Sequence, residues 1–298
     1  MAKVKKKIKP AAKAVAQPAP APTVTPTPTQ AALPGVDAAA TPAEAARAAQ
    51  QREDWPLAAR LWAQARAKTP DSLVAYDEGL VCLGHAGLLA EREALFGQAA
   101  ETFSTEPRFS VEHAWLAHHR RDWPAAIERW TTLNKRFPGH LTYHLGAAAT
   151  YSAAGMAEKA DAVLEAGAEL HPDNRDIQVA YARQAQARGD LDLALKRWEA
   201  MRVHLPHEAL GYSFGAMTLF DAGRPDDVTA LLTQAVKQLS DFATRADGLP
   251  TVLNFARDPM RYEQWQQAHI RLGALRKAFA ANTEIARDHA ACAARITP

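Results

Sequence analysis

The chain has 298 residues, of which 48% are hydrophobic and 23% charged, and its formal net charge is +2. It contains no run of about eighteen apolar residues, which excludes an ordinary membrane-spanning helix. The only two cysteines, Cys82 and Cys292, lie far apart and in no metal or redox motif, so we expect a reducing, cytoplasmic compartment.

Residues 1–40 differ in composition from the rest of the chain and are predicted to form a disordered tail. They contain no aromatic residue, and the Ala/Pro/Thr run over 14–34 favours extended, polyproline-like conformers. Such a flexible basic segment would tether the protein to an anionic surface, a membrane or nucleic acid, weakly and with strong salt dependence. A tail that only keeps the protein soluble is the other interpretation. Its lysines are Lys3, Lys5, Lys6, Lys7, Lys9 and Lys13, and no acidic residue precedes Asp37.

The folded part is predicted to begin at Thr41. Thr41 can cap the first free amides of a helix, Pro42 suits the first helical position, and Glu44 completes a capping box. A helix is therefore expected directly after the tail.

A stretch of nine residues, Asp122–Trp130, recurs along the chain at a constant spacing. Met156–Leu164 follows it after one 34-residue step, and Asp190–Trp198 follows after a second. Asp54–Trp62 precedes it by two such steps. This 34-residue unit is typical of a helical repeat array.

Each unit is predicted to form two helices separated by a tight turn. Gly155, Gly189 and Gly223 occupy this turn at successive 34-residue steps, where a left-handed backbone is needed, and Arg121 takes the same place in another unit. We expect six such pairs, over 41–70, 71–107, 108–138, 139–172, 173–206 and 207–240.

The second helix of each unit carries an alanine four residues before a large apolar residue, with a proline eight residues further on. The pairs are Ala58/Trp62, Ala126/Trp130, Ala160/Leu164 and Ala194/Trp198. Both residues lie on one helix face, where the alanine lets a neighbouring helix approach and the large side chain fills the space beside it. We therefore expect Trp62, Trp130 and Trp198 in the core.

This pattern resembles the second half of the tetratricopeptide repeat, and the resemblance extends over residues 41–240. It implies an all-α, right-handed superhelix of antiparallel helix pairs, with a concave groove lined by the first helices. It also implies a scaffold for protein–protein interaction, of the kind that bacterial members often supply to assemblies building or exporting envelope components. The first-half pattern of the family is mostly missing here, and the second unit is degenerate.

Residues 241–298 lose the 34-residue period and are predicted to form C-terminal capping helices. Asp258 can cap a helix beginning at Pro259. A final helix is expected over about 283–294. In the helix beginning at Pro259, the predicted buried face holds Trp265, Leu272, Leu275 and Phe279, and the opposite face holds Gln264, Gln267, Arg271 and Lys277.

The candidate binding residues follow from the 34-residue step along the first helices, on the face that the resemblance assigns to the groove. The groove would hold an extended peptide or a helix of another protein. Paired Lys and Asn residues, with which some family members bind the carboxylate tail of chaperones, are missing from these positions. The candidates are Arg47, Trp115, His118, Arg183, Gln186, Met217 and Phe220.

No segment carries a signature of catalysis or of a cofactor. Nucleotide-binding and hydrolase motifs are missing. The pair His140 and His144 has helical spacing for one metal, yet the sequence shows no third ligand, so we expect surface or groove histidines instead. The sequence therefore predicts a non-catalytic scaffold with no cofactor and no metal, and an enzyme with an unrecognised site is the remaining alternative.

Overall fold

The structure, a computed structural model, describes residues 41–296. Within that range it contains fifteen α-helices, one short 3-10 helix and no strand. The predicted lysine tail lies outside the described residues. Helix α1 begins at the predicted capping box, because the Thr41 hydroxyl accepts a hydrogen bond from the Glu44 amide and the Glu44 carboxylate accepts one from the Thr41 amide.

The first twelve helices form the six expected pairs, which confirms the all-α prediction. The pairs are α1 (Pro42–Gln51) with α2 (Trp55–Lys68), α3 (Leu73–His85) with α4 (Leu89–Thr102), α5 (Pro107–His119) with α6 (Trp123–Arg136), α7 (Leu141–Ala153) with α8 (Ala157–Leu170), α9 (Arg175–Ala187) with α10 (Leu191–His204), and α11 (Ala209–Asp221) with α12 (Pro225–Gln238).

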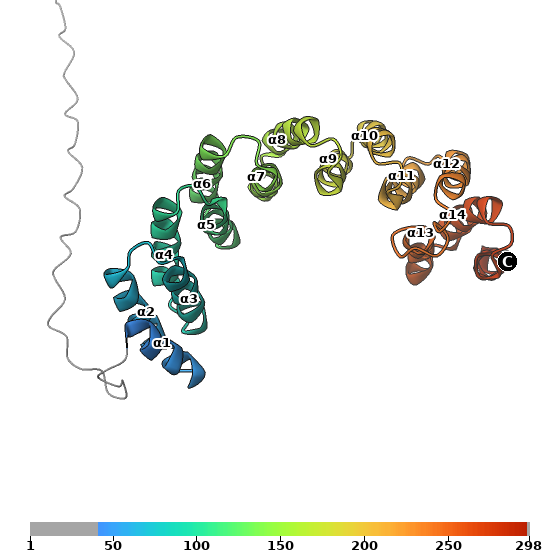
Figure 1. The fold of residues 1–298 in the computed structure, drawn as a ribbon. Coiled ribbons are helices and arrows are strands. Elements are labelled where there is room, and N and C mark those ends of the chain that lie inside the picture. Colours follow the sequence, from blue (N-terminus) through green and yellow to red (C-terminus); the bar gives the residue numbers. More distant parts are fainter. Residues whose placement is uncertain (1–40, 297–298) are drawn as a thin grey trace, which may run out of the picture.

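The pairs are arranged side by side in an open superhelical arc (Figure 1). The second helices, among them α6, α8, α10 and α12, lie on the outer side of the arc. The first helices, among them α5, α7, α9 and α11, lie on the inner side. The inner side is therefore built from first helices, as the resemblance implies.

A left-handed residue ends the turn inside each pair. Gly155, Gly189 and Gly223 have φ of 75°, 77° and 69°, as the spacing predicts. Arg121 has φ of 60° at the same place, so a non-glycine residue adopts this conformation here. In three pairs an aspartate then caps the second helix; the Asp122 carboxylate, for example, accepts a hydrogen bond from the Ala125 amide.

The core lies between the inner and outer helices. Trp62, Trp130 and Trp198 are at most 1% exposed, so their predicted burial is confirmed. Each lies four residues after an alanine with no exposed surface, which allows the two helices of the pair to approach closely.

A seventh helix pair is present that the sequence pattern did not predict. It consists of α13 (Leu249–Arg257), extended by the 3-10 helix at Asp258–Tyr262, and α14 (Trp265–Ala278). Glu263 has φ of 58° in its turn, and it lies six positions beyond the place that the 34-residue step from Gly223 would give. The extra six residues lie in the long connection between α12 and α13, where Phe242 is fully buried. The period is therefore displaced at this point, while the helix pairs continue.

Two expectations for this region are wrong. No α-helix begins at Pro259, because residues 258–262 form the 3-10 helix and α14 begins only at Trp265. Arg271 does not face solvent but is 8% exposed, since its guanidinium donates to the Phe255 carbonyl oxygen at 3.0 Å. The expected last helix is present as α15 (Thr283–Ile296). That residues 241–298 act as a cap stays a prediction.

Candidate functional site

A stripe of residues follows the inner helices at the 34-residue step. In each of these helices the residue just before the stripe residue is buried in the core. The stripe residue itself is not buried, so it lies at the edge of the core, towards the inner side. The members of the stripe range from half-buried to exposed. We call these residues the inner stripe: Arg47, Val81, Trp115, Ala149, Arg183 and Met217.

Ala149 and Val81 are the two members that are not among the candidates from the sequence; Ala149 follows Trp115 by one step, and the step to Val81 was passed over. Val81 lies one 34-residue step after Arg47 and one step before Trp115, and it is 47% exposed. The second unit departs from the repeat pattern elsewhere, which obscured this position. The spacing alone is the signal that would have found it.

The predicted residues three positions further on are more enclosed than the stripe. His118 is half-buried and hydrogen-bonded to the Thr150 hydroxyl at 3.0 Å, with its ring against Trp115 and Trp123. Gln186 is also half-buried. Both therefore lie at the edge of the inner stripe.

Phe220 does not line an open surface, so the prediction for this residue is wrong. It is 8% exposed, and its ring stacks on Phe255 of α13 at a centroid distance of 6.3 Å. The unforeseen seventh helix pair covers it. We therefore leave Phe220 out of the candidate surface.

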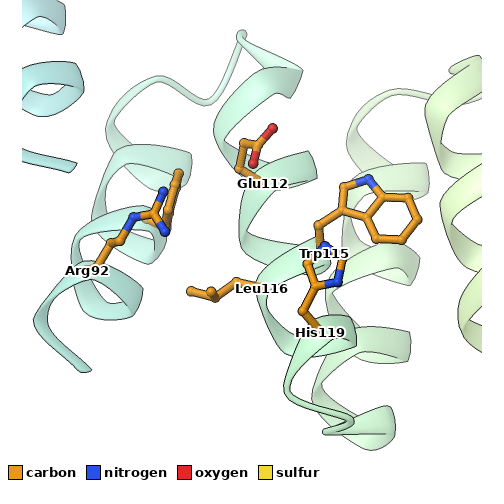
Figure 2. A pocket seen from close by; sticks show the side chains of 6 residues that line it. Arg92, Glu112, Trp115, Leu116 and His119 are labelled. Atoms are coloured by element: carbon orange, nitrogen blue, oxygen red, sulfur yellow. The ribbon is translucent and has the colours of Figure 1, made fainter. Parts of the chain in front are cut away.

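A pocket of about 390 Å³ lies next to Trp115, between α4 and α5 (Figure 2). Its apolar lining residues are Phe96, Leu116 and Trp115, and the Trp115 ring stacks on His119 with centroids 5.7 Å apart. Its polar lining consists of Arg92, Glu112 and His119. The lining of the pocket therefore combines Trp115, the aromatic member of the inner stripe, with charged side chains.

The pocket has a cause in the sequence of α4. Arg92 lies one 34-residue step after Ala58 and one step before Ala126, so it occupies the position of the packing alanine. Phe96 takes the corresponding tryptophan position and is buried. The guanidinium needs more room than the methyl group that four other pairs carry at this place, and α3 and α4 are in less extensive contact than the two helices of any other of the first six pairs.

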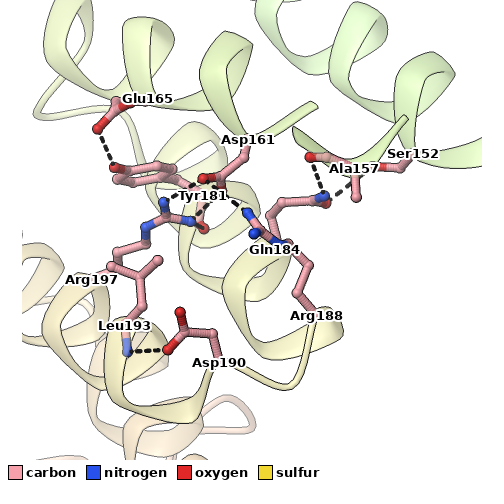
Figure 3. Close-up of polar contacts among 10 residues, drawn as sticks. All are labelled: Ser152, Ala157, Asp161, Glu165, Tyr181, Gln184, Arg188, Asp190, Leu193 and Arg197. Carbon is pink, nitrogen blue, oxygen red and sulfur yellow. Dashed lines mark hydrogen bonds and ion pairs between the residues drawn. The ribbon is translucent and has the colours of Figure 1, made fainter. Parts of the chain in front are cut away.

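Arginines of the outer helices form ion pairs between successive helix pairs. Arg197 of α10 donates to both carboxylate oxygens of Asp161 in α8, at 2.6 and 2.9 Å, and to the Tyr181 carbonyl oxygen (Figure 3). Arg129 of α6 donates to one carboxylate oxygen of Glu93 in α4 and to the His113 carbonyl oxygen, and the other Glu93 oxygen pairs with Arg120. The hydrogen bond from Arg129 is the largest cause lowering the pKa of Glu93. These contacts lie within the scaffold and position the helices that carry the inner stripe.

We expect the protein to lose stability as the pH falls below neutrality. Burial, reinforced by Arg129 and opposed by Glu93, lowers the pKa of His113 to about 4. An unfolded histidine titrates near 6.5, so the stabilising contribution of neutral His113 is complete above about pH 6.5 and is lost as the pH falls towards 4. Burial also lowers the pKa values of His118, His144 and His289, which act in the same direction.

Urea denaturation at about pH 7.5 and about pH 5 measures this effect. The His113→Gln variant should show a smaller difference between the two pH values than the unmodified protein. His207→Gln, at an exposed histidine, should leave the difference unchanged. An unchanged pH dependence in His113→Gln would contradict the assignment.

Within residues 41–296, no group of three or more metal-ligating side chains comes together. His140 precedes α7, while His144 lies inside it, is only 4% exposed and is hydrogen-bonded to the Val163 carbonyl oxygen at 3.0 Å, so the expected surface or groove position is wrong for His144. Among the same residues, no helix combines the length and the apolar character needed to cross a bilayer.

Comparison with known proteins identifies the fold. No family model and no curated protein matches the chain. Among solved structures, the C-terminal part of a TPR repeat-containing protein from Cytophaga hutchinsonii is similar, with 10% identity and a TM-score of 0.54, and covers 82% of this chain and 97% of its own. A tetratricopeptide repeat protein from Parabacteroides merdae is similar at 13% identity and a TM-score of 0.48, over 84% of this chain and 97% of its own. The chain thus has a tetratricopeptide-like helical-repeat fold.

Proposed function

We propose that this protein is a non-catalytic scaffold that holds a peptide or helix of another protein against the inner side of its arc. The observation that carries the proposal is the inner stripe, which presents Val81 and Trp115 on adjacent units with a pocket beside them. The repeat fold supports a general role in protein–protein interaction.

The stripe offers a mixture of contacts suited to such a ligand. Val81 and Met217 provide apolar surface, Trp115 provides an aromatic face, and Arg47 and Arg183 provide positive charge. Aromatic and arginine side chains often dominate the binding energy of protein interfaces, so Trp115 and Arg183 are the residues to test first.

Capture of binding partners from a lysate tests the proposal. Trp115→Ala/Arg183→Glu should lose partners that the unmodified protein retains, with binding weakened by at least about 30-fold. A matched control on the outer helices is Val203→Ala/Lys135→Glu, because Val203 is 73% exposed on α10 and Lys135 is exposed on α6. This control should retain the partners.

Thermal melting of both variants must show that they fold, since the Trp115 ring also packs edge-on against Trp130. If folded inner and outer variants capture the same proteins, the partner is not bound on the inner stripe and the proposal is wrong.

A further inference from the structure

The enclosed arginines of the outer helices have polar partners for their guanidinium groups, with one exception. Arg66 and Arg202 donate to the carbonyl oxygens of Ala75 and Gly211. Within residues 41–296, the Arg92 guanidinium has no hydrogen bond and no ion pair, and its Nε is buried without a partner. The remaining members, which donate to carbonyl oxygens and to carboxylates, are Arg129, Arg197 and Arg271.

The environment of Arg92 is that of a binding pocket and not of open solvent. Its guanidinium carbon lies 5.3 Å from the centre of the Phe96 ring. Helix α3 passes close by, since a β-carbon built on Gly84 would lie 3.4 Å from Arg92 Nε. Leu116 points towards Arg92 from α5, while the Trp115 ring, on the same helix, points away from Arg92 (Figure 2). A cation held against apolar side chains without a partner favours an anion that enters together with apolar surface.

The other charged groups of the pocket define the type of anion. Glu112 lies on the exposed rim and His119 stacks on Trp115. A phosphate with two negative charges would be repelled by Glu112 and would meet only one arginine. A single carboxylate pairs with Arg92, whose half-buried position strengthens the attraction, while the exposed Glu112 is more strongly screened by water.

We propose that this pocket receives a large apolar side chain of the partner segment, and that an adjacent Asp or Glu side chain of the same segment pairs with Arg92. This inference rests on the proposed function and specifies the partner: an acidic residue next to a large apolar one. In this interpretation, the arginine that takes the place of the packing alanine in α4 is a specificity-determining residue.

Short blocked peptides test the pairing directly. The probes are Ac-Ala-Glu-Phe-Ala-NH2 and Ac-Ala-Gln-Phe-Ala-NH2, which differ only in the charge next to the phenylalanine. The readout is the NMR shift of the Trp115 indole N–H, assigned with Trp115→Phe. The Glu peptide should bind in about the millimolar range, and the Gln peptide about tenfold more weakly.

Variants of the full-length protein then locate the interaction. Arg92→Gln should remove the preference for the Glu peptide, while Arg183→Gln, at an arginine of the inner stripe, should keep it. Glu112→Gln should strengthen binding of the Glu peptide, which loss of folding cannot produce. Equal binding of the two peptides by the unmodified protein overturns the inference, as does a preference that persists in Arg92→Gln.

A third probe, Ac-Ala-Gln-Phe with a free carboxyl terminus, identifies the source of the carboxylate. Tighter binding of this peptide than of the Glu peptide would show that the pocket prefers a chain terminus and would overturn the assignment to a side chain. The lysate experiment keeps the two proposals separate. If partner capture depends on Trp115 and Arg183 but not on Arg92, only the present inference is wrong.

Discussion

Replacing Trp130 with alanine is expected to lower the free energy of unfolding by about 3–5 kcal/mol and to divide one unfolding transition into two. Trp130 is 1% exposed and joins two successive pairs. Its indole N–H donates to the Thr150 hydroxyl of α7 at 2.9 Å. A β-carbon built on Gly146, also in α7, would lie 2.3 Å from the Trp130 ring, so the ring fills the space left by this glycine.

The division into two transitions follows from the linear arrangement of the pairs. In a repeat array, stability is approximately the sum of the units and of the contacts between neighbours. The substitution leaves a cavity at the contact between the third and fourth pairs, and it leaves the buried Thr150 hydroxyl without its indole donor. The two halves of the arc then unfold more independently.

Urea denaturation followed by circular dichroism measures both effects. Trp123→Ala is the matched control, because Trp123 begins the same helix but is only half-buried at the turn. Trp123→Ala should lower the free energy of unfolding clearly less than Trp130→Ala and keep a single unfolding transition. A loss below about 1 kcal/mol in Trp130→Ala would contradict the assigned role, since it would fall within the range of ordinary surface changes.

The fold was predictable because it repeats. Four of the six pairs have an alanine for close helix contact, and all six have a large apolar residue four positions later and a left-handed turn residue, so the 34-residue spacing predicts six pairs from the sequence alone. The seventh pair was not predicted because six extra residues shift it: Ala268 and Leu272 keep the four-residue spacing but lie 40 residues, not 34, after Val228 and Leu232.

The candidate site was predictable only in part. Trp115 and Arg183 follow from the spacing, since they lie one residue beyond a buried alanine. The burial of Phe220 depends on α13, which approaches only in the folded chain. The candidate role of Arg92 depends on the lack of a partner for its guanidinium, and sequence spacing cannot show a missing contact.

Removal of the Asp161 carboxylate is expected to cause the second large loss of stability. Asp161→Ala is expected to lower the free energy of unfolding by about 3–5 kcal/mol, because it leaves the guanidinium of Arg197 buried without its counter-ion. The Arg197 side chain is 6% exposed and lies over the Tyr181 ring at 3.6 Å. Burial opposes its charge, but the hydrogen bonds and charge of Asp161, together with Tyr181, raise the pKa of Arg197.

The pair between Arg271 and Asp221 provides the comparison, since it joins the last two helix pairs at a longer distance of 3.4 Å. Burial lowers the pKa of Arg271 and raises that of Asp221, so desolvation outweighs attraction at this pair. Asp221→Ala should therefore cost less than Asp161→Ala. An exposed pair gives the lower limit: Asp176→Ala should change stability by less than about 1 kcal/mol, because Asp176 and Arg175 are both solvent-exposed.

A double-mutant cycle separates the energy of the Arg197–Asp161 ion pair from the contribution of side-chain packing. Arg197→Met keeps most of the volume and removes the charge, so Asp161→Ala in the Arg197→Met background should cost much less than in the unmodified protein. Urea denaturation of the four proteins gives the coupling energy, expected at about 1–3 kcal/mol. Equal costs of Asp161→Ala in both backgrounds would mean that Asp161 stabilises the arc through contacts other than Arg197, with Arg188 at 3.4 Å the nearest alternative.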